Sequence, residues 1–210
     1  MKSHYRILFL FNFFFFLFFI LKAEAQDLHS GDLIFRIEGN SSFSNAITES
    51  TAFNDSIKTI HVGIIENDRD SVWVIEADPE EGVRRIPFHG FLLQSPNGVI
   101  VKRLDKNFNA GAIIQRAKNY LSQPYDWWYL PDNGKIYCSE LVWETFIDDD
   151  GNRLFDAKPM NFRDKDGNLP QFWIDLFEKL DTPVPENVPG TNPQDMFNLP
   201  ELKLIWSNKF

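Results

Sequence analysis

The order of short β-rich runs and later helices most constrains how this chain can fold. Runs rich in Val, Ile and Phe, bounded by turn residues, predict strands at 31–38, 59–65, 71–78, 81–88 and 98–104. Apolar residues recur at helical spacing in 41–53, 110–123 and 138–147, and a further helix is possible at 170–180. Short polar turns between neighbouring runs favour antiparallel hairpins. Strands followed mainly by helices predict an α+β fold.

The N-terminus has the pattern of an export signal. A basic segment at 2–6 precedes an apolar run at 7–21, and Ala23 and Ala25 follow with the spacing of an A-x-A cleavage site. The apolar run is shorter than the roughly 20 residues of a membrane-spanning helix. We therefore expect a signal peptide over 1–25 and an exported protein, periplasmic or extracellular. An uncleaved anchor is the alternative, whereas the lack of a cysteine near the site excludes a lipoprotein anchor.

Residues 26–210 are expected to form one domain, with a C-terminal extension from about 148. Without the predicted signal peptide the formal net charge is −11. Such an acidic protein attracts neither nucleic acid nor an anionic membrane surface, so we expect neither as a partner, and no stable membrane span after cleavage. One cysteine and scattered histidines predict no metal site. We expect no cofactor, and the sequence leaves the oligomeric state open.

Cys138, the only cysteine, lies where a loop gives way to the helix predicted at 138–147. A lone cysteine is usually a small buried hydrophobe. At the first turn of a helix, however, free N–H groups and the helix dipole stabilise a thiolate. Composition alone leaves both a packed thiol and a nucleophile open. Glu140, two residues later and about 200° around the helix, is expected to face away from Cys138 and to serve structure or solvent.

His61 and Glu76 lie on adjacent predicted strands. His61 shares a strand face with Gly63, and a glycine in a strand often marks the close approach of another group. If the hairpin turn centres on Asp68 and Arg69, His61 lies directly opposite Glu76, with β-carbons roughly 5 Å apart. The carboxylate could then accept a hydrogen bond from the imidazole. The alternatives are a hydrogen-bonded core histidine and a solvent-facing glutamate, and a one-residue slip in register would separate the two.

The loop before Cys138 is rich in aromatic side chains. Tyr125 and Trp128 could line a cleft or pack in the core, since aromatic residues dominate cores. Asp126 could orient the loop or receive a cationic group of a substrate. We include all three among the candidate substrate-binding residues.

Five short motifs occur in one order along the chain: GDLIF at 31–35, HVGII at 61–65, VIEA at 74–77, PYD at 124–126 and YCSELV at 137–142. Together they resemble the circularly permuted papain-like amidases of the YiiX/YebB type, relatives of the NlpC cell-wall peptidases. The resemblance implies a permuted papain-like fold, in which an antiparallel sheet, or half-barrel, packs against the helix that carries the cysteine. Two departures from the family pattern, the long approach to the histidine at 50–60 and the aromatic stretch at 125–133, are expected to bear on substrate choice.

The same resemblance assigns roles to residues. It implies that Cys138 is the nucleophile, His61 the base and Glu76 the acid that orients the imidazole, and that Tyr137 and Asp32 line the site. A Cys–His pair with an orienting carboxylate is the arrangement that nucleophilic acyl transfer requires.

The sequence therefore predicts an exported cysteine amidase or peptidase that works through an acyl-enzyme. The resemblance to cell-wall peptidases implies a small amide or peptide substrate, either a peptidoglycan peptide or an amide-linked lipid or amino acid. Two alternatives stay open. One is an acyltransferase or thioesterase that uses the same triad on lipid esters. The other is a non-catalytic module that binds a ligand in a papain-like groove.

Overall fold

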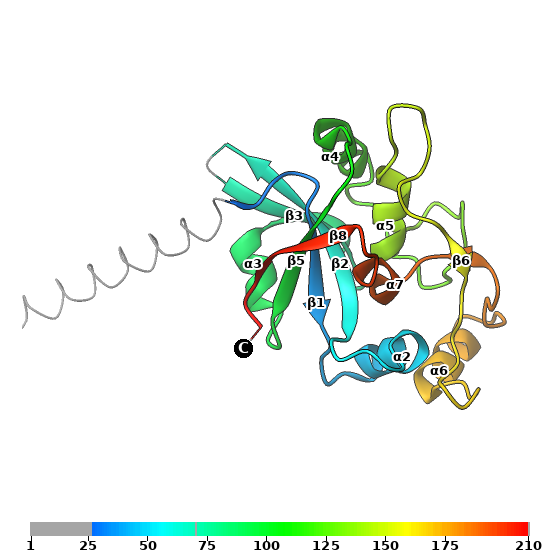
Figure 1. Ribbon diagram of the computed structural model, residues 1–210. Helices are drawn as coiled ribbons and strands as arrows, with labels where there is room; N and C mark the ends of the chain where they lie inside the picture. Colours follow the sequence, from blue (N-terminus) through cyan, green and yellow to red (C-terminus); the bar gives the residue numbers. More distant parts are fainter. Residues whose placement is uncertain (1–26, 70, 210) are drawn as a thin grey trace, which may run out of the picture.

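The computed structural model describes residues 27–69 and 71–209, and the predicted signal peptide lies outside these residues. Its main feature is a six-stranded sheet in the order β4-β3-β2-β1-β5-β8, antiparallel throughout (Figure 1). The strands are β1 (Leu33–Ile37), β2 (Thr59–Asp68), β3 (Ser71–Asp78), β4 (Gly82–Pro87), β5 (Val99–Leu104) and β8 (Leu202–Ser207). The helices are α2 (Ser42–Thr51), α3 (Phe88–Leu93), α4 (Ala110–Asn119), α5 (Cys138–Thr145), α6 (Gln171–Lys179) and α7 (Pro193–Phe197).

Alternation along the strands gives the sheet two apolar faces, because successive side chains of a strand point to opposite sides. Val62 and Ile64 belong to the larger core, to which α2, α4, α5, α6 and α7 contribute. Ile65 and Val74 belong to a smaller core, which Phe91 of α3 covers. The predicted α+β fold, an antiparallel sheet packed against the helix that carries the cysteine, is confirmed.

The register of the β2–β3 hairpin differs from the prediction. Asp68 pairs with Ser71, so the turn centres one residue later, and Arg69 adopts a left-handed φ of 56° there. Continued along the strands, this register would place Asp78, not Glu76, directly opposite His61. The shift moves the pairing by two residues, and a shift of two keeps every side chain on its predicted face. His61 and Glu76 therefore still share a face, as diagonal neighbours.

The C-terminal part of the chain returns to the sheet. After α5, a short two-stranded sheet forms between β6 (Lys158–Pro159) and β7 (Pro189–Gly190), and β8 then pairs with β5 at the sheet edge. Trp173 and Phe177 of α6 are buried in the larger core. The segment predicted as an extension thus shares its core with the sheet and α5.

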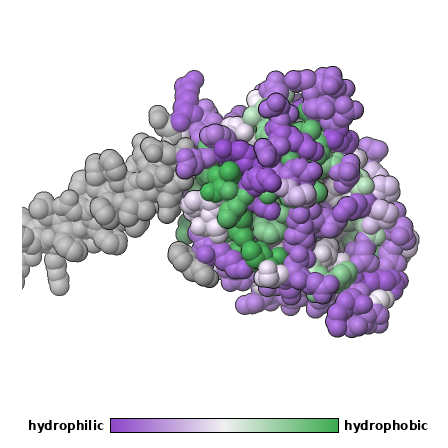
Figure 2. All heavy atoms as spheres, viewed as in Figure 1, coloured by the Kyte–Doolittle hydropathy of each residue, from purple (hydrophilic) through white to green (hydrophobic). Residues whose placement is uncertain are grey.

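Most of the face shown in Figure 2 is hydrophilic, and an apolar patch lies over α3, β5 and β8, where Leu92, Ile205 and Trp206 are only partly buried. Within residues 27–69 and 71–209, no helix has the length and apolar character needed to cross a membrane.

Candidate active site

His61 and Glu76 are in direct contact. Nε2 of His61 lies 2.5 Å from Oε2 of Glu76, and both side chains are buried. The β2–β3 ladder ends at Ile64 and Ile75, so the two side chains meet beyond the paired part of the hairpin. Phe91 of α3 stacks on the imidazole with ring centroids 6.0 Å apart. The ring is therefore held by a carboxylate at one nitrogen and by an aromatic face.

Cys138 is the first residue of α5, and its side chain is only 5% exposed. The helix sits against β2 and β3. Leu141, Val142 and Phe146, apolar residues at the helical spacing of 138–147, are fully buried. As a residue of the first turn, Cys138 has a backbone N–H without an intrahelical acceptor. The start of α5 thus presents a thiol and a free N–H together.

The imidazole of His61 is favoured in its protonated form by the charges of neighbouring residues. Burial opposes protonation, but the negative charge of Cys138, a hydrogen bond to it and the contact with Glu76 outweigh burial and raise the pKa of His61 to about 9. Cys138 and Glu76 therefore both act on the one imidazole. A thiolate and an imidazolium held by a carboxylate form the ion pair of a cysteine nucleophile.

Two arginines that were not predicted from the sequence stabilise the ionised form of Glu76. Nε and Nη2 of Arg84 both donate to Oε1 of Glu76, at 3.0 and 2.8 Å, and Nη2 of Arg36 lies 3.6 Å from Oε2. Burial alone would raise the pKa of Glu76, yet His61, Arg36 and Arg84 lower it to about 2. Arg84 pairs directly with Glu76 across the β3–β4 hairpin. A predicted register for the β3–β4 hairpin could therefore have identified Arg84 as a partner of Glu76.

Glu140, in contrast to Glu76, has acidic rather than basic neighbours. Its carboxylate accepts a hydrogen bond from the backbone N–H of Tyr137 at 3.2 Å and so caps α5. Burial, together with the negative charges of Asp126, Glu144 and Asp132, raises the pKa of Glu140 to about 8 in spite of that bond. The prediction of a structural role agrees with this geometry, although the side chain is buried rather than turned to solvent.

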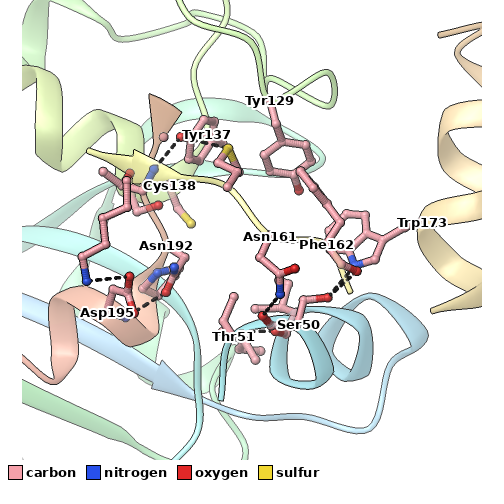
Figure 3. A pocket seen from close by; sticks show the side chains of 18 of the residues that line it. Ser50, Thr51, Tyr129, Tyr137, Cys138, Asn161, Phe162, Trp173, Asn192 and Asp195 are labelled. Atoms are coloured by element: carbon pink, nitrogen blue, oxygen red, sulfur yellow. Dashed lines mark hydrogen bonds and ion pairs between the residues drawn. The ribbon is translucent and has the colours of Figure 1, made fainter. Parts of the chain in front are cut away.

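A chamber of about 320 Å³ opens beside Cys138, and Sγ points into it (Figure 3). Of the predicted substrate-binding residues, Tyr137 and Tyr125 line it. The Tyr137 hydroxyl accepts a hydrogen bond from the backbone N–H of Thr191 at 3.1 Å. Other parts of the wall come from α2, from the start of β2 and from the C-terminal segment: Ile47, Ser50, Thr51, Phe53, Ile60, Lys158, Pro159, Met160, Asn161, Phe162, Trp173, Gly190, Thr191, Asn192, Pro193 and Asp195.

The C-terminal segment had no local signal for this role. Gly190 shows how tightly it fits: a Cβ atom there would lie 2.3 Å from Sδ of Met160 and 2.9 Å from the Tyr137 hydroxyl. A larger residue at this position would require Met160 or Tyr137 to shift. The contact joins residues far apart in sequence, which periodicity and spacing cannot detect.

Three predicted substrate-binding residues lie outside the chamber lining. The buried carboxylate of Asp32 is engaged by Arg103, with Nε at 2.6 Å and Nη2 at 2.8 Å. Asp126 accepts hydrogen bonds at 2.9 Å from three groups of its own loop, so it orients the loop. Trp128 packs beneath the ammonium group of Lys135, 4.3 Å from the ring centroid. Other protein groups engage all three side chains in this geometry, and their contact with a substrate stays a prediction.

Comparisons with known proteins agree with this architecture. The family model of a permuted papain-like amidase enzyme, YaeF/YiiX, C92 family, matches residues 27–206. The uncharacterized protein YiiX of Escherichia coli (strain K12) is 27% identical over 187 residues, which cover 87% of this chain and 88% of that protein. The crystal structure of metalloprotein yiiX from Escherichia coli O157:H7 superposes with a TM-score of 0.71 at 24% identity, covering 87% of this chain and 98% of that one. The chain belongs to the permuted papain-like amidase family YaeF/YiiX, C92.

Proposed function

We propose that this protein is an exported cysteine amidase that cleaves an amide bond through a Cys138–His61–Glu76 triad. The observation that carries the proposal is the buried imidazole of His61, held by Glu76 at 2.5 Å and raised in pKa by Cys138. Membership of an amidase family supports the reaction class. The N-terminal signal pattern supports export.

The first half-reaction forms a thioester. Because Glu76 engages Nε2 of His61, the other ring nitrogen, Nδ1, is free to take the proton of Cys138. Sγ then attacks the carbonyl carbon, and the oxyanion accepts a hydrogen bond from the backbone N–H of Cys138. As the C–N bond breaks, His61 gives the proton to the leaving amine. Glu76 keeps the ring oriented throughout.

The second half-reaction returns the enzyme to its starting state. Water takes the place of the departed amine, and His61 accepts one of its protons while the oxygen attacks the thioester carbonyl. The C–S bond breaks, the acid leaves, and Sγ regains the proton. An acyltransferase would run the same sequence with an alcohol or amine in place of water, so product analysis distinguishes the two.

The proposed mechanism uses protein groups alone. One structural relative is described as a metalloprotein, and a metal would need at least three clustered donors. Among residues 27–69 and 71–209, no group of three His, Cys, Asp or Glu side chains is placed to hold one. Glu76, the carboxylate nearest His61, has both oxygens engaged by His61 and Arg84.

Alkylation by iodoacetamide tests the ion pair, and with a single cysteine every thiol adduct, identified by peptide mapping, reports on Cys138. We expect rapid labelling of the folded protein near neutral pH and labelling at least tenfold slower in His61→Ala, because the imidazolium stabilises the thiolate. His89→Ala, an exposed histidine of α3, is the matched control and should label at the wild-type rate. Labelling that begins only when the protein unfolds would overturn the proposal.

A further inference from the structure

The chamber beside Cys138 is lined mainly by apolar and aromatic side chains. Its far wall joins α2 to the C-terminal segment, through Ile47 and Phe53 on one side and Met160, Phe162 and Trp173 on the other. Within that wall the aromatic rings pack edge to face, with Phe162 and Trp173 centroids 5.2 Å apart. The volume of about 320 Å³ lies within the range of small-molecule sites, which begins near 300 Å³.

Polar side chains of the wall are turned to the protein rather than to the chamber. The Ser50 hydroxyl donates to the carbonyl of Phe162 at 2.8 Å and accepts from Nε1 of Trp173 at 3.1 Å. Thr51 donates to the carbonyl of Ile47 at 2.8 Å, and Nδ2 of Asn161 donates to the carbonyl of Ser50 at 2.9 Å. These groups are satisfied without a ligand, so what the wall offers a ligand is apolar surface.

The charges of the lining cancel. Lys158 and Asp195 are its only charged residues, and their side chains form an ion pair at 3.0 Å. A cell-wall peptide carries several carboxylates, and among the described lining residues no cation is left over to pair with them. A charge taken into such a site without a partner is strongly disfavoured. The chamber therefore selects against anionic peptides.

Two hydroxyls of the lining are different. Oγ of Ser139 and Oγ1 of Thr191 are buried and have no hydrogen-bond partner within the described part of the chain. Ser139 follows the nucleophile, and the backbone N–H of Thr191 is bound to Tyr137. Buried hydroxyls are normally paired. The unpaired hydroxyls of the lining thus belong to the residue that follows Cys138 and to the residue bound to Tyr137.

We infer that the chamber binds the acyl chain of an N-acyl amide, so that the substrate is an amide-linked lipid whose amide group lies at Cys138. The inference rests on the proposed function and specifies its substrate. The acyl chain lies along Phe53, Met160 and Phe162, and the hydroxyls of Ser139 and Thr191 bind the polar end. The acyl group that forms the thioester with Sγ is the one that fills the chamber, and the products are a fatty acid and an amine.

A series of acyl-aminocoumarin amides from acetyl to decanoyl tests this, with fluorescence of the released amine as the readout. We expect kcat/KM to rise up to about fourfold for each added methylene, the factor that corresponds to burying one methylene group. A charged γ-glutamyl peptide amide should be a poorer substrate than butanoyl amide. Cleavage that is independent of acyl length, or faster for the charged peptide, would overturn the inference while leaving the amidase proposal intact.

Binding to Cys138→Ala separates the two proposals. We expect the Kd of the uncleaved amides, followed by the fluorescence of Trp173 and the other tryptophans, to fall with acyl length as kcat/KM rises. Length-dependent binding without turnover in the wild type would support the chamber and overturn the amidase. An absence of length-dependent binding would overturn the chamber whatever the turnover.

Variants of the wall locate the effect. Thr51→Phe on α2 narrows the chamber and should lower kcat/KM for decanoyl amide at least tenfold while sparing acetyl amide. Met160→Trp is a second variant in case the first does not fold. Thr191→Val removes one unpartnered hydroxyl and should lower kcat/KM for every chain length alike. Leu93→Ala, an apolar side chain that is 82% exposed on α3, is the matched control and should keep the wild-type profile.

Discussion

Two buried glutamates of this protein, Glu76 on β3 and Glu140 on α5, have opposite protonation behaviour. Both are less than a tenth exposed, and burial alone would raise the pKa of each. Glu76 faces Arg36, Arg84 and His61, and its pKa falls to about 2. Glu140 faces other acids, and its pKa rises to about 8. The partners, not the depth of burial, decide which carboxyl is charged.

The difference assigns different work to the two acids. A permanently ionised Glu76 can hold an imidazolium in one orientation, as a triad requires. A protonated Glu140 can still accept a hydrogen bond from Tyr137 and cap the helix that positions Cys138, without adding a negative charge to the start of that helix. The charged glutamate of the site thus comes from the sheet, and the neutral one comes from the helix.

The largest effect on activity is expected for the replacement of Glu76 by glutamine, and the same replacement at Glu140 is its comparison. Glu76→Gln should lower kcat/KM for an acyl-aminocoumarin amide on the order of 10³- to 10⁴-fold, the scale on which an orienting carboxylate acts in such triads. Glu140→Gln should stay within about twofold, because the native side chain is already neutral. Equal losses in the two variants would break the comparison. Circular dichroism of both variants confirms folding.

The cations around Glu76 give the next largest effect, on stability. Arg84→Met leaves Glu76 with one guanidinium, and breaking a buried pair costs about 3–5 kcal/mol. Lys58→Met is the control, since Lys58 pairs with Glu38 at 3.7 Å on the surface, where such pairs contribute about 0–1 kcal/mol. Urea denaturation measures both. A loss below about 1 kcal/mol for Arg84→Met would show that Arg84 does not stabilise Glu76.

The pH dependence of stability separates the two glutamates by sign. Folded Glu140 keeps a proton that the unfolded chain releases near pH 4.5, so its contribution is lost as pH rises from about 4.5 to 8. The loss is on the order of 3 kcal/mol by neutral pH. Folded Glu76 has a lowered pKa, so its contribution is present above about pH 4.5 and lost as pH falls towards 2.

Denaturation of the wild type and the two glutamine variants across this range checks the signs. Glu140→Gln should lack the decline between pH 4.5 and 8, and Glu76→Gln should lack the decline on the acid side. Glu76→Gln also removes the contact that raises the pKa of His61, so its difference from wild type reports on the pair, whereas the Glu140→Gln difference reports on one carboxyl. A wild-type curve that rises from pH 4.5 to 8 by the same amount as Glu140→Gln would contradict the assignment.

Alternation and order along the chain were enough to predict five of the six strands of the sheet, the cysteine helix and the shared face of His61 and Glu76, but not the edge strand β8. The two side chains lie on the predicted face in spite of the error in the turn. The pairing register moved by two residues, and side-chain direction in a strand repeats every two residues. Within a polar stretch the sequence contains little information about the exact residue on which a turn centres. The apolar face of a strand, in contrast, is determined by many residues at once.

The chamber could not be predicted in the same way. Its walls meet through contacts such as the Ser50 hydroxyl with the carbonyl of Phe162, more than a hundred residues apart. Asp32 was assigned to the site through the family resemblance, and Asp126 through its place in the aromatic loop before Cys138. The sequence does not show that Arg103 and the loop backbone already engage their carboxylates. The position of a motif in the sequence indicates that a residue lies near the site, and only the fold shows which groups its side chain contacts.

The smallest kinetic effect is expected at Asp32, a buried acid that resembles Glu76 in being held by an arginine. Its partner Arg103 lies outside the chamber lining, and the carboxylate also accepts the backbone N–H of His29 at 2.8 Å. Asp32→Asn should therefore leave KM and kcat within about twofold of wild type, while the free energy of unfolding falls by about 1.5–3 kcal/mol, as for a hydrogen bond to a charged group. Steady-state kinetics and urea denaturation measure the two quantities on one preparation. If KM rises tenfold while the midpoint of unfolding stays fixed, Asp32 contacts the substrate after all, and an arginine-held acid in this protein does not have to be structural.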